Sequence, residues 1–434
     1  MSKRHVEGVP VLQAPRWSAE WLRARAAEWL AQPDVRAALV AMLGLRMLCS
    51  LAAAAVPLLD PRYPWLNPLQ SDHFHHAIYA PGTPLPRYSP LDYLTLPWER
   101  WDTAWYVDIA RHGYATYGST AFMPLYPILA HIVAPLFGAD VLAAELAIST
   151  VAAFFVFLAL YRLAEVLAPR RGLGPYALLI AVFLPTSFYF MAAYTESLYL
   201  ALAMWAVLAA LAQRWRRFAL LAALAALTRQ QGILLSVLVL PVATLGVLWI
   251  ISWRRAQRPR PHDVGAALLA GAAPLVAYGG WMAVLRFAMH APLPWDPLVA
   301  SNVWNLRFTW PGSGVLADMV VLIHPPKGFA IGSLALDVIA TLAALGALLV
   351  AVRRLPKGVA LYLLAVWCTA LIKVLPNGMT VSEGRYMLQM LPLCMVPAAA
   401  LARSGTILRL AWIVVGTLTV VIFLWSFVLW KIVI

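Results

Sequence analysis

The sequence contains few charged residues, and acidic residues are especially scarce. Only 12% of its 434 residues are charged, and 33 Lys and Arg outnumber 19 Asp and Glu. Soluble globular proteins average about 25% charged residues, so this composition excludes an ordinary soluble domain. The basic excess does not indicate nucleic-acid binding, because the arginines lie in short loops beside apolar segments and not on one face of a soluble domain.

Cysteine is also scarce, and several familiar signals are absent. Cys49, Cys368 and Cys394 each lie inside an apolar run without metal or redox spacing, so we expect small buried side chains. There is no N-x-S/T sequon, internal repeat or Gly/Ser linker, which favours a single domain. The first 34 residues lack the apolar core of a signal peptide, so we expect the first membrane span to act as an uncleaved anchor.

Long apolar runs are what the sequence has in abundance. Hydrophobic residues make up 62%, in runs that recur from Val35 almost to the C-terminus, and about 20 residues suffice to cross a bilayer. The short alternating segments of a membrane barrel are missing, so we predict an all-α polytopic membrane protein. The runs predict about eleven spans: 36–58, 141–168, 175–191, 197–213, 218–230, 232–251, 264–288, 332–352, 359–376, 387–402 and 409–430.

The distribution of arginine predicts the orientation of these spans. Alternate loops carry the arginine clusters, whereas the long loop before Phe122 carries six acids and four arginines. Cytoplasmic loops are enriched in Lys and Arg, so the arginine loops and the N-terminus are expected inside. The inner clusters are Arg170 and Arg171; Arg214, Arg216 and Arg217; Arg254, Arg255, Arg258 and Arg260; Arg353, Arg354 and Lys357; Arg403 and Arg409.

This topology divides the chain into a tail and one membrane domain. Residues 1–35 are predicted to form a cytoplasmic tail lying at the membrane interface, and 36–434 the transmembrane domain. Two large extracytoplasmic loops are expected, at 60–140 and 289–331. Phe122–Gly138 is apolar but short and holds three prolines, so we predict a re-entrant or surface-lying helix there.

A first group of chemistry-bearing residues lies in the first outer loop. Asp102 lies among Trp101, Trp105 and Tyr106 in a segment with helical spacing. A carboxylate in a partly dry aromatic cavity suits a general base, and aromatic rings suit stacking on sugar faces. The alternative is an interfacial aromatic belt in which Asp102 merely caps the helix.

Two further polar segments interrupt apolar runs on the same predicted side. In Tyr194–Ser197, Thr195 could cap the next helix and Glu196 would lie in its first turn. In Thr228–Gly232, Arg229 lies at membrane depth, where a cation indicates function by default and suits a phosphate. The alternative there is a plain hairpin from which Arg229 reaches the interface.

The last polar segment opens the tenth predicted span. Arg385 enters the membrane edge beside Tyr386, positioned for a lipid phosphate; the alternative is a structural ion pair of Arg385 with Glu383 or Glu196. Further outer cations are Arg286, Arg307 and Lys373. Asp72–His76 has metal-capable side chains without a metal-binding spacing, Arg46 is expected to bond a neighbouring helix, and His131 to be a satisfied structural histidine.

Together these segments resemble the GPI mannosyltransferase II (PIG-V) family of the GT-C superfamily. The resemblance is most specific in the first outer loop and runs in order from about residue 98 to 395. Its blocks are Arg100–Tyr114 with Ala121–Pro127, Phe188–Leu198, Thr228–Gly232, Trp304–Pro311, and Gly384–Tyr386 followed by Pro392. Thr103 and Gln230-Gln231 depart from the family pattern. The Ala- and Arg-rich chain is most similar to prokaryotic members, so the eukaryotic GPI acceptor is not carried over.

The resemblance implies a GT-C-like bundle and a glycosyltransferase that uses a polyprenyl-phosphate sugar, in first place mannose. The acceptor hydroxyl would lie outside the cytoplasm, on a glycan, lipid or protein, and the enzyme would be a multi-pass protein of a bacterial plasma membrane. Asp102 is the expected base. Arg229, Arg385 and Arg307 are the expected phosphate ligands. The expected sugar and acceptor pocket comprises Arg100, Trp101, Trp105, Tyr106, Tyr194, Glu196, Gln230, Gln231 and Tyr386.

One acid with several arginines fits a reaction whose leaving group is a phosphate, since no general acid is then required. A single in-line displacement predicts inversion. No metal ligand set is assigned, and a divalent cation that helps the phosphate leave stays open. Two alternatives also remain: a transporter or flippase of a lipid-linked sugar, or the same enzyme class with glucose, arabinose or another sugar.

Overall fold

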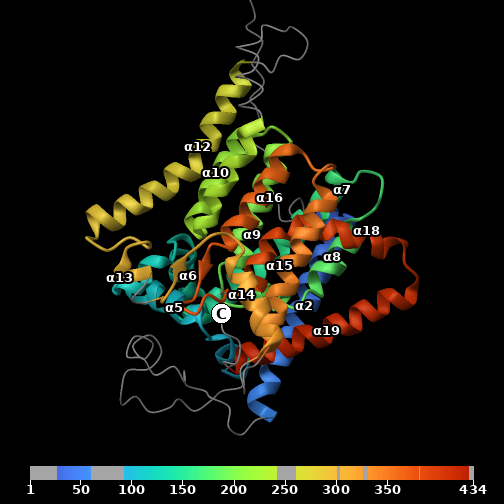
Figure 1. Ribbon diagram of the computed structural model, residues 1–434, viewed down its shortest axis with the longest axis horizontal. Coiled ribbons are helices and arrows are strands. Elements are labelled where there is room, and N and C mark those ends of the chain that lie inside the picture. Colours follow the sequence, from blue (N-terminus) through green and yellow to red (C-terminus); the bar gives the residue numbers. More distant parts are fainter. Residues whose placement is uncertain are drawn as a thin grey trace, which may run out of the picture.

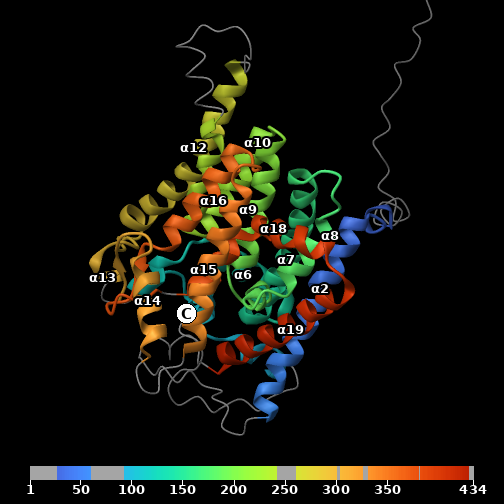
Figure 2. The same ribbon diagram turned by 45° about the vertical axis from the view of Figure 1, so that its right-hand side comes forward.

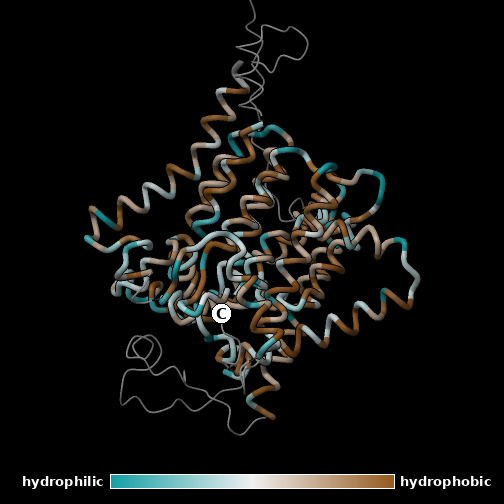
Figure 3. The backbone as a smooth tube through the Cα atoms, in the orientation of Figure 1, coloured by the Kyte–Doolittle hydropathy of each residue, from teal (hydrophilic) through white to brown (hydrophobic). Residues whose placement is uncertain are grey.

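The computed structural model describes residues 27–59, 92–241, 261–300, 304–325, 331–380 and 382–429. Most of the predicted N-terminal tail, the Asp72–His76 segment and the Arg254–Arg260 cluster lie outside these ranges. The described part is a helical bundle (Figure 1) whose helices are largely hydrophobic along their length, with hydrophilic residues gathered in the connections (Figure 3).

The elements follow one another with short connections, and several helices are only two or three turns long. In chain order they are α2 (Pro33–Leu59), α4 (Asp92–Thr95), η1 (Leu96–Trp98), α5 (Asp102–His112), η2 (Tyr117–Ala121), α6 (Leu125–Val133), η3 (Ala134–Phe137), α7 (Val141–Leu167), α8 (Gly174–Val182), η4 (Ser187–Phe190), α9 (Glu196–Leu211), α10 (Trp215–Thr228), η5 (Gln230–Val239), α12 (Pro261–Ala283), the π-turn η6 (Val284–Ala288), α13 (Pro297–Ala300), β1 (Arg307–Phe308), α14 (Ser313–Ile323), α15 (Ile331–Ala351), α16 (Lys357–Ala370), β2 (Lys373–Val374), α17 (Glu383–Tyr386), η7 (Met387–Cys394), α18 (Met395–Arg403) and α19 (Thr406–Val428).

Six helical segments in the described ranges are long and apolar enough to cross a membrane, which confirms the all-α polytopic membrane class. They are Pro33–Leu59, Val141–Leu167, Val264–Ala288, Gly332–Ala351, Glu383–Arg403 and Thr406–Val428. Five shorter apolar segments are Leu125–Phe137, Glu196–Leu211, Gln230–Val239, Ser313–Ile323 and Lys357–Ala370. The short helix predicted within Phe122–Gly138 is present as α6 and η3.

Two predicted spans are wrong as continuous helices. The span 175–191 ends as an α-helix at Val182, ahead of Pro185, because the residue before a proline avoids helical backbone. The span 232–251 is helical, first as a 3₁₀-helix, as far as the structure describes it, and its residues from 242 on lie outside the described ranges. The span 359–376 ends at Ala370 and gives way to strand β2. Helical backbone therefore stops where polar side chains gather.

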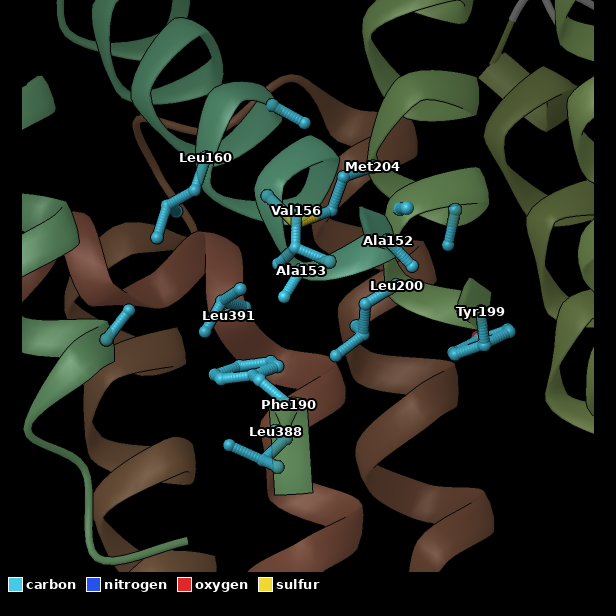
Figure 4. Packing of buried hydrophobic residues seen from close by; sticks show 14 of the residues in the cluster. Ala152, Ala153, Val156, Leu160, Phe190, Tyr199, Leu200, Met204, Leu388 and Leu391 are labelled. Carbon is cyan, nitrogen blue, oxygen red and sulfur yellow. The ribbon is translucent and has the colours of Figure 1, made fainter. Parts of the chain in front are cut away.

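Helix α7 lies at the centre of the bundle and packs against α2, α6, α8 and α9. Its buried face pairs small residues such as Ala152 and Ala153 with Leu160, and Leu200 of α9 and Leu388 of η7 pack nearby (Figure 4). Small side chains let apolar helices approach closely. In a bilayer this close packing drives helix association, because lipid tails are as apolar as the helices and the hydrophobic effect contributes little. The core thus supports the ends of α9 and η7, next to the polar site.

A two-stranded antiparallel sheet, which was not predicted, connects the segment predicted as the second extracytoplasmic loop to the segment after α16. Arg307 pairs with Val374 and Phe308 with Lys373. The α7–α8, α9–α10 and α15–α16 connections lie at the upper side of the molecule, whereas α5, α6 and α14 lie in its lower half (Figures 1 and 2). These three arginine-rich connections are thus separated from α5, α6 and α14.

Candidate active site

Four charged side chains from distant parts of the chain form one hydrogen-bonded network. Arg385 donates from Nη1 to Asp102 Oδ2 at 2.7 Å. Arg385 Nε and Arg229 Nη1 both donate to Glu196 Oε1. Acid and arginine alternate along the chain Asp102, Arg385, Glu196, Arg229, so the network is neutral when every group is ionised.

The network is buried except at one end. The side chains of Glu196, Arg385 and Arg229 are 4%, 6% and 10% exposed, whereas that of Asp102 is 21% exposed. Buried charges are costly unless they are paired and hydrogen-bonded, and the alternation satisfies that condition. Asp102 is therefore the acidic group that an incoming substrate can reach.

Aromatic and hydroxyl groups hold the two arginines from the side. The Arg385 guanidinium carbon lies 4.4 Å from the ring centre of Tyr194 and 5.6 Å from that of Tyr189, in cation–π geometry. Arg229 lies 5.6 Å from the ring of Tyr386, and its Nη1 donates to Thr195 Oγ1 at 3.2 Å. These contacts restrict both guanidinium groups to one orientation.

A phenol completes this wall of the site. The hydroxyls of Tyr106 and Thr195 lie 3.2 Å apart, within hydrogen-bond distance. Burial raises the pKa of the Tyr106 phenol, and the nearby Asp102 carboxylate raises it further. Tyr106 therefore stays a neutral hydrogen-bonding group across the physiological range.

The backbone just before Asp102 is held in a rarely used conformation. Trp101 has φ +54°, a left-handed value that is costly for a non-glycine residue and is often found at functional sites. The amide of Asp102 donates to the Tyr194 hydroxyl at 3.1 Å, and that hydroxyl donates to the carbonyl of Arg100 at 3.3 Å. Tyr194 thus fixes the main chain on both sides of Trp101.

The end of α19 anchors the same segment. Arg100 Nε donates to the Val428 carbonyl at 2.8 Å, and Trp101 Nε1 donates to the Phe427 carbonyl at 3.3 Å. The last carbonyls of a helix lack partners within it and favour a cation, so this contact stabilises both partners. Arg100 is only 2% exposed and serves this junction, away from any accessible surface.

Of the simpler structural roles that the sequence also allowed for these residues, the structure excludes helix capping and an interfacial Arg229 but contains one of the ion pairs. Capping fails: the N-cap of α5 is Trp101 and that of α9 is Thr195, and neither makes a side-chain capping bond. Arg229 is buried against Glu196 and does not reach out to an interface. The alternative ion pair of Arg385 with Glu196 is present, together with the bond from Arg385 to Asp102.

Two acids that the sequence reading missed position the loop that carries Arg385. Asp318 of α14 accepts from the Thr380 amide at 3.1 Å and from its hydroxyl. Asp337 of α15 accepts from the Gly384 amide at 2.6 Å, and a small cavity beside this contact is also lined by Arg385. Each is an acid inside an otherwise apolar helix, and that isolation was a usable signal.

The predicted sugar and acceptor pocket divides into buried and accessible parts. Trp105, Tyr106 and Tyr194 are buried, and Trp105 packs against Phe122 and Trp304 at ring-centre distances of 5.8 and 5.3 Å. The predicted residues that retain accessible surface beside Asp102's network are Trp101, Gln230, Gln231 and Tyr386. Arg307 lies exposed on β1, outside the network.

The secondary predictions have clear outcomes where the structure describes them. Arg46 donates to Thr150 Oγ1 and to the Leu146 carbonyl of α7, as predicted. His131 Nδ1 lies 2.8 Å from the Ala110 carbonyl, which fits a satisfied structural histidine. Within the described ranges, no group of three or more His, Cys, Asp or Glu side chains is placed to hold a metal ion.

The fold and site define an integral membrane protein with a buried acid–arginine network that opens at one carboxylate. Residues 92–261 match the family model of the mannosyltransferases (PIG-V), which confirms the resemblance seen in the sequence over this segment. The matched segment contains Asp102, Glu196 and Arg229 and supports glycosyltransferase activity. No curated protein and no solved structure matches the chain.

Proposed function

We propose that this protein transfers a sugar, in first place mannose, from a polyprenyl phosphate to an acceptor hydroxyl on the extracytoplasmic face of a membrane. The observation that carries the proposal is the bond between Asp102 and Arg385, which places a reachable carboxylate beside a buried guanidinium. The mannosyltransferase (PIG-V) match supports the reaction class. A base next to a phosphate-binding cation is the pair of groups that such a transfer needs.

The chemistry is a single displacement at the anomeric carbon. Asp102 takes the proton of the acceptor hydroxyl as its oxygen bonds to the anomeric carbon. The bond from that carbon to the phosphate oxygen breaks, and its electron pair leaves with the polyprenyl phosphate. Attack opposite the leaving group inverts the anomeric configuration, so retention with this donor would contradict the displacement.

Arg229 and Arg385 would stabilise the charge that grows on the departing phosphate. Both guanidinium groups are held by aromatic rings and by Glu196, so little reorganisation is needed when the charge develops. The accessible Trp101, Gln230 and Tyr386 would contact the sugar or the acceptor. A divalent cation that assists the phosphate is compatible with this arrangement, although no step depends on it.

The test is a transfer assay with purified protein in nanodiscs, radiolabelled polyprenyl-phosphate mannose and a membrane-lipid extract. Asp102→Asn should lower the rate by about 10³-fold or more, because the amide cannot accept the proton. The matched control is Asp108→Asn on the same helix, whose carboxylate bonds His112 and not the network. We expect that control to retain wild-type activity.

Equal activity of wild type and Asp102→Asn would show that Asp102 is not the base. Saturable donor binding without transfer or donor hydrolysis, in a folded wild-type protein, would favour transport of a lipid-linked sugar instead. Thermal unfolding of each variant is measured as well, so that a lower transfer rate can be distinguished from a loss of folded protein.

A further inference from the structure

Glu196 is the one acid of the network that no substrate can reach directly. It is 3% exposed, and its Oε1 accepts from both arginines. Its second oxygen, Oε2, is buried and has no hydrogen-bond partner among the described residues. A carboxylate in this position acts on substrate through the arginines, not by contact.

Both arginines keep donors free while they bind Glu196. Within the described residues, Arg229 uses only Nη1 for hydrogen bonds, and Arg385 uses Nε and Nη1. Within the described residues, Nε and Nη2 of Arg229 and Nη2 of Arg385 form no hydrogen bond. A phosphate bound through these donors would not have to displace Glu196, whose charge would then stay in place throughout the reaction.

That retained charge matters because the donor and the product differ in charge. The donor is a phosphodiester with one negative charge, whereas the released polyprenyl phosphate is a monoester with about −1.5 to −2 at neutral pH. Two arginines without a counter-ion would bind the product more tightly than the donor, since Coulomb attraction scales with charge. The enzyme would then be held in its product complex.

We propose that Glu196 is the internal counter-ion of the phosphate site. Its negative charge lowers the net positive charge of the two arginines, so that they do not trap the phosphomonoester product. This inference rests on the proposed function and adds the control of product release. Glu196 is a positioning and charge-setting residue, because it touches the arginines and not the substrate.

Equilibrium binding of farnesyl phosphate, a short soluble phosphomonoester, tests the proposal on the purified full chain. Glu196→Gln should bind this probe about 10-fold more tightly than wild type, because one opposing charge is removed at close range. The matched control is Glu145→Gln, which removes another fully buried, unpartnered carboxyl group from α7. We expect the control to bind as wild type does.

A purely structural role for Glu196 predicts the opposite change in the affinity for farnesyl phosphate. If Glu196 only positions the arginines, its replacement disorders them and weakens binding, and equal or weaker binding by Glu196→Gln overturns the proposal. Glu196→Asp keeps the charge and should bind within about 3-fold of wild type. If Glu196→Asp bound the probe about 10-fold more tightly than wild type, as expected for Glu196→Gln, the counter-ion proposal would also be overturned.

A measurement on wild type alone guards against a variant that does not fold. Farnesyl phosphate and its methyl phosphodiester should bind within about 3-fold of each other at pH 7.5, because the resting network is neutral. A preference above about 10-fold for the monoester overturns the counter-ion proposal. If neither probe binds saturably, the proposed phosphate site itself is wrong, which distinguishes that failure from the failure of this inference.

Discussion

Individual acidic residues in this protein have different roles because their surroundings differ. Asp102 and Glu196 are paired with arginines, whereas Asp318 and Asp337 accept backbone amides and hold a loop. Glu99 lies two positions from the strained Trp101 and is 7% exposed. Burial raises the pKa of Glu99 to about 7, although Arg111 and Arg100 oppose that shift.

The raised pKa of Glu99 predicts a pH-dependent stability. Between its ordinary pKa of 4.5 and about 7, the folded protein keeps the Glu99 proton while the unfolded chain has lost it. Stability therefore falls as pH rises through this window, and the loss is complete above it. Glu99→Gln should remove this component, so its melting temperature should exceed that of wild type by a few degrees at pH 8.

The measurement is thermal unfolding of both proteins in the same detergent at pH 5 and pH 8. The variant's advantage should be larger at pH 8 than at pH 5. A constant difference at both pH values would show that Glu99 is ionised in the folded protein throughout this range.

At the scale of elements, the site depends on helices that stop short and on close contacts between them. Arg229 lies where α10 ends and η5 turns back against it. Gly232 makes that turn possible, since a Cβ there would lie 2.3 Å from the Ala226 nitrogen. The bonds from Arg100 and Trp101 to the end of α19 likewise fix the segment that begins α5 and carries Asp102.

Gly232→Ala should push η5 away from α10 and displace Arg229. We expect transfer to fall at least about 10-fold and the melting temperature to fall by several degrees, because the clash is with backbone and cannot be relieved by a rotamer change. The control is Gly44→Ala in α2, where an added Cβ would have no neighbouring atom within 4 Å. That change should be neutral or slightly stabilising. Wild-type activity of Gly232→Ala would contradict the packing described for this turn.

At the scale of the whole molecule, most of the described arginine-rich connections lie away from the elements around the polar site. The α7–α8, α9–α10 and α15–α16 connections lie at the upper side in Figures 1 and 2, away from α5 and α14, whereas the α18–α19 connection with Arg403 lies at the right of Figure 1. Positive loops favour the cytoplasmic side. The site would accordingly face the extracytoplasmic side, where a lipid-linked donor and a hydroxyl acceptor can meet.

Single-cysteine labelling in intact cells tests this orientation. Tyr117, 60% exposed in the predicted first extracytoplasmic loop, and Arg171, in the exposed α7–α8 connection, are suitable positions. Tyr117→Cys should react with a membrane-impermeant maleimide from outside, and Arg171→Cys only after the cells are opened. The native Cys49 and Cys394 are buried as expected, but Cys368 is only partly buried and is replaced by serine in both variants to keep the background low. The reverse pattern would invert the topology.

Composition and pattern by themselves determined the membrane class, most long helices and the polar segments of the site, because partition into a bilayer depends on local runs of side chains. Arg229 and Arg385 stood out because each interrupts or borders an apolar run, and Asp102 because it lies among aromatic residues with helical spacing. Only the tertiary structure decided their partners. Asp102 and Arg385 are 283 positions apart and meet because four separate elements end at one place. The same packing buries Arg100 and Tyr194 and places Asp337 within hydrogen-bond distance of the loop at Gly384. It also places Glu196, an acid in the first turn of α9, between two arginines that both bind it.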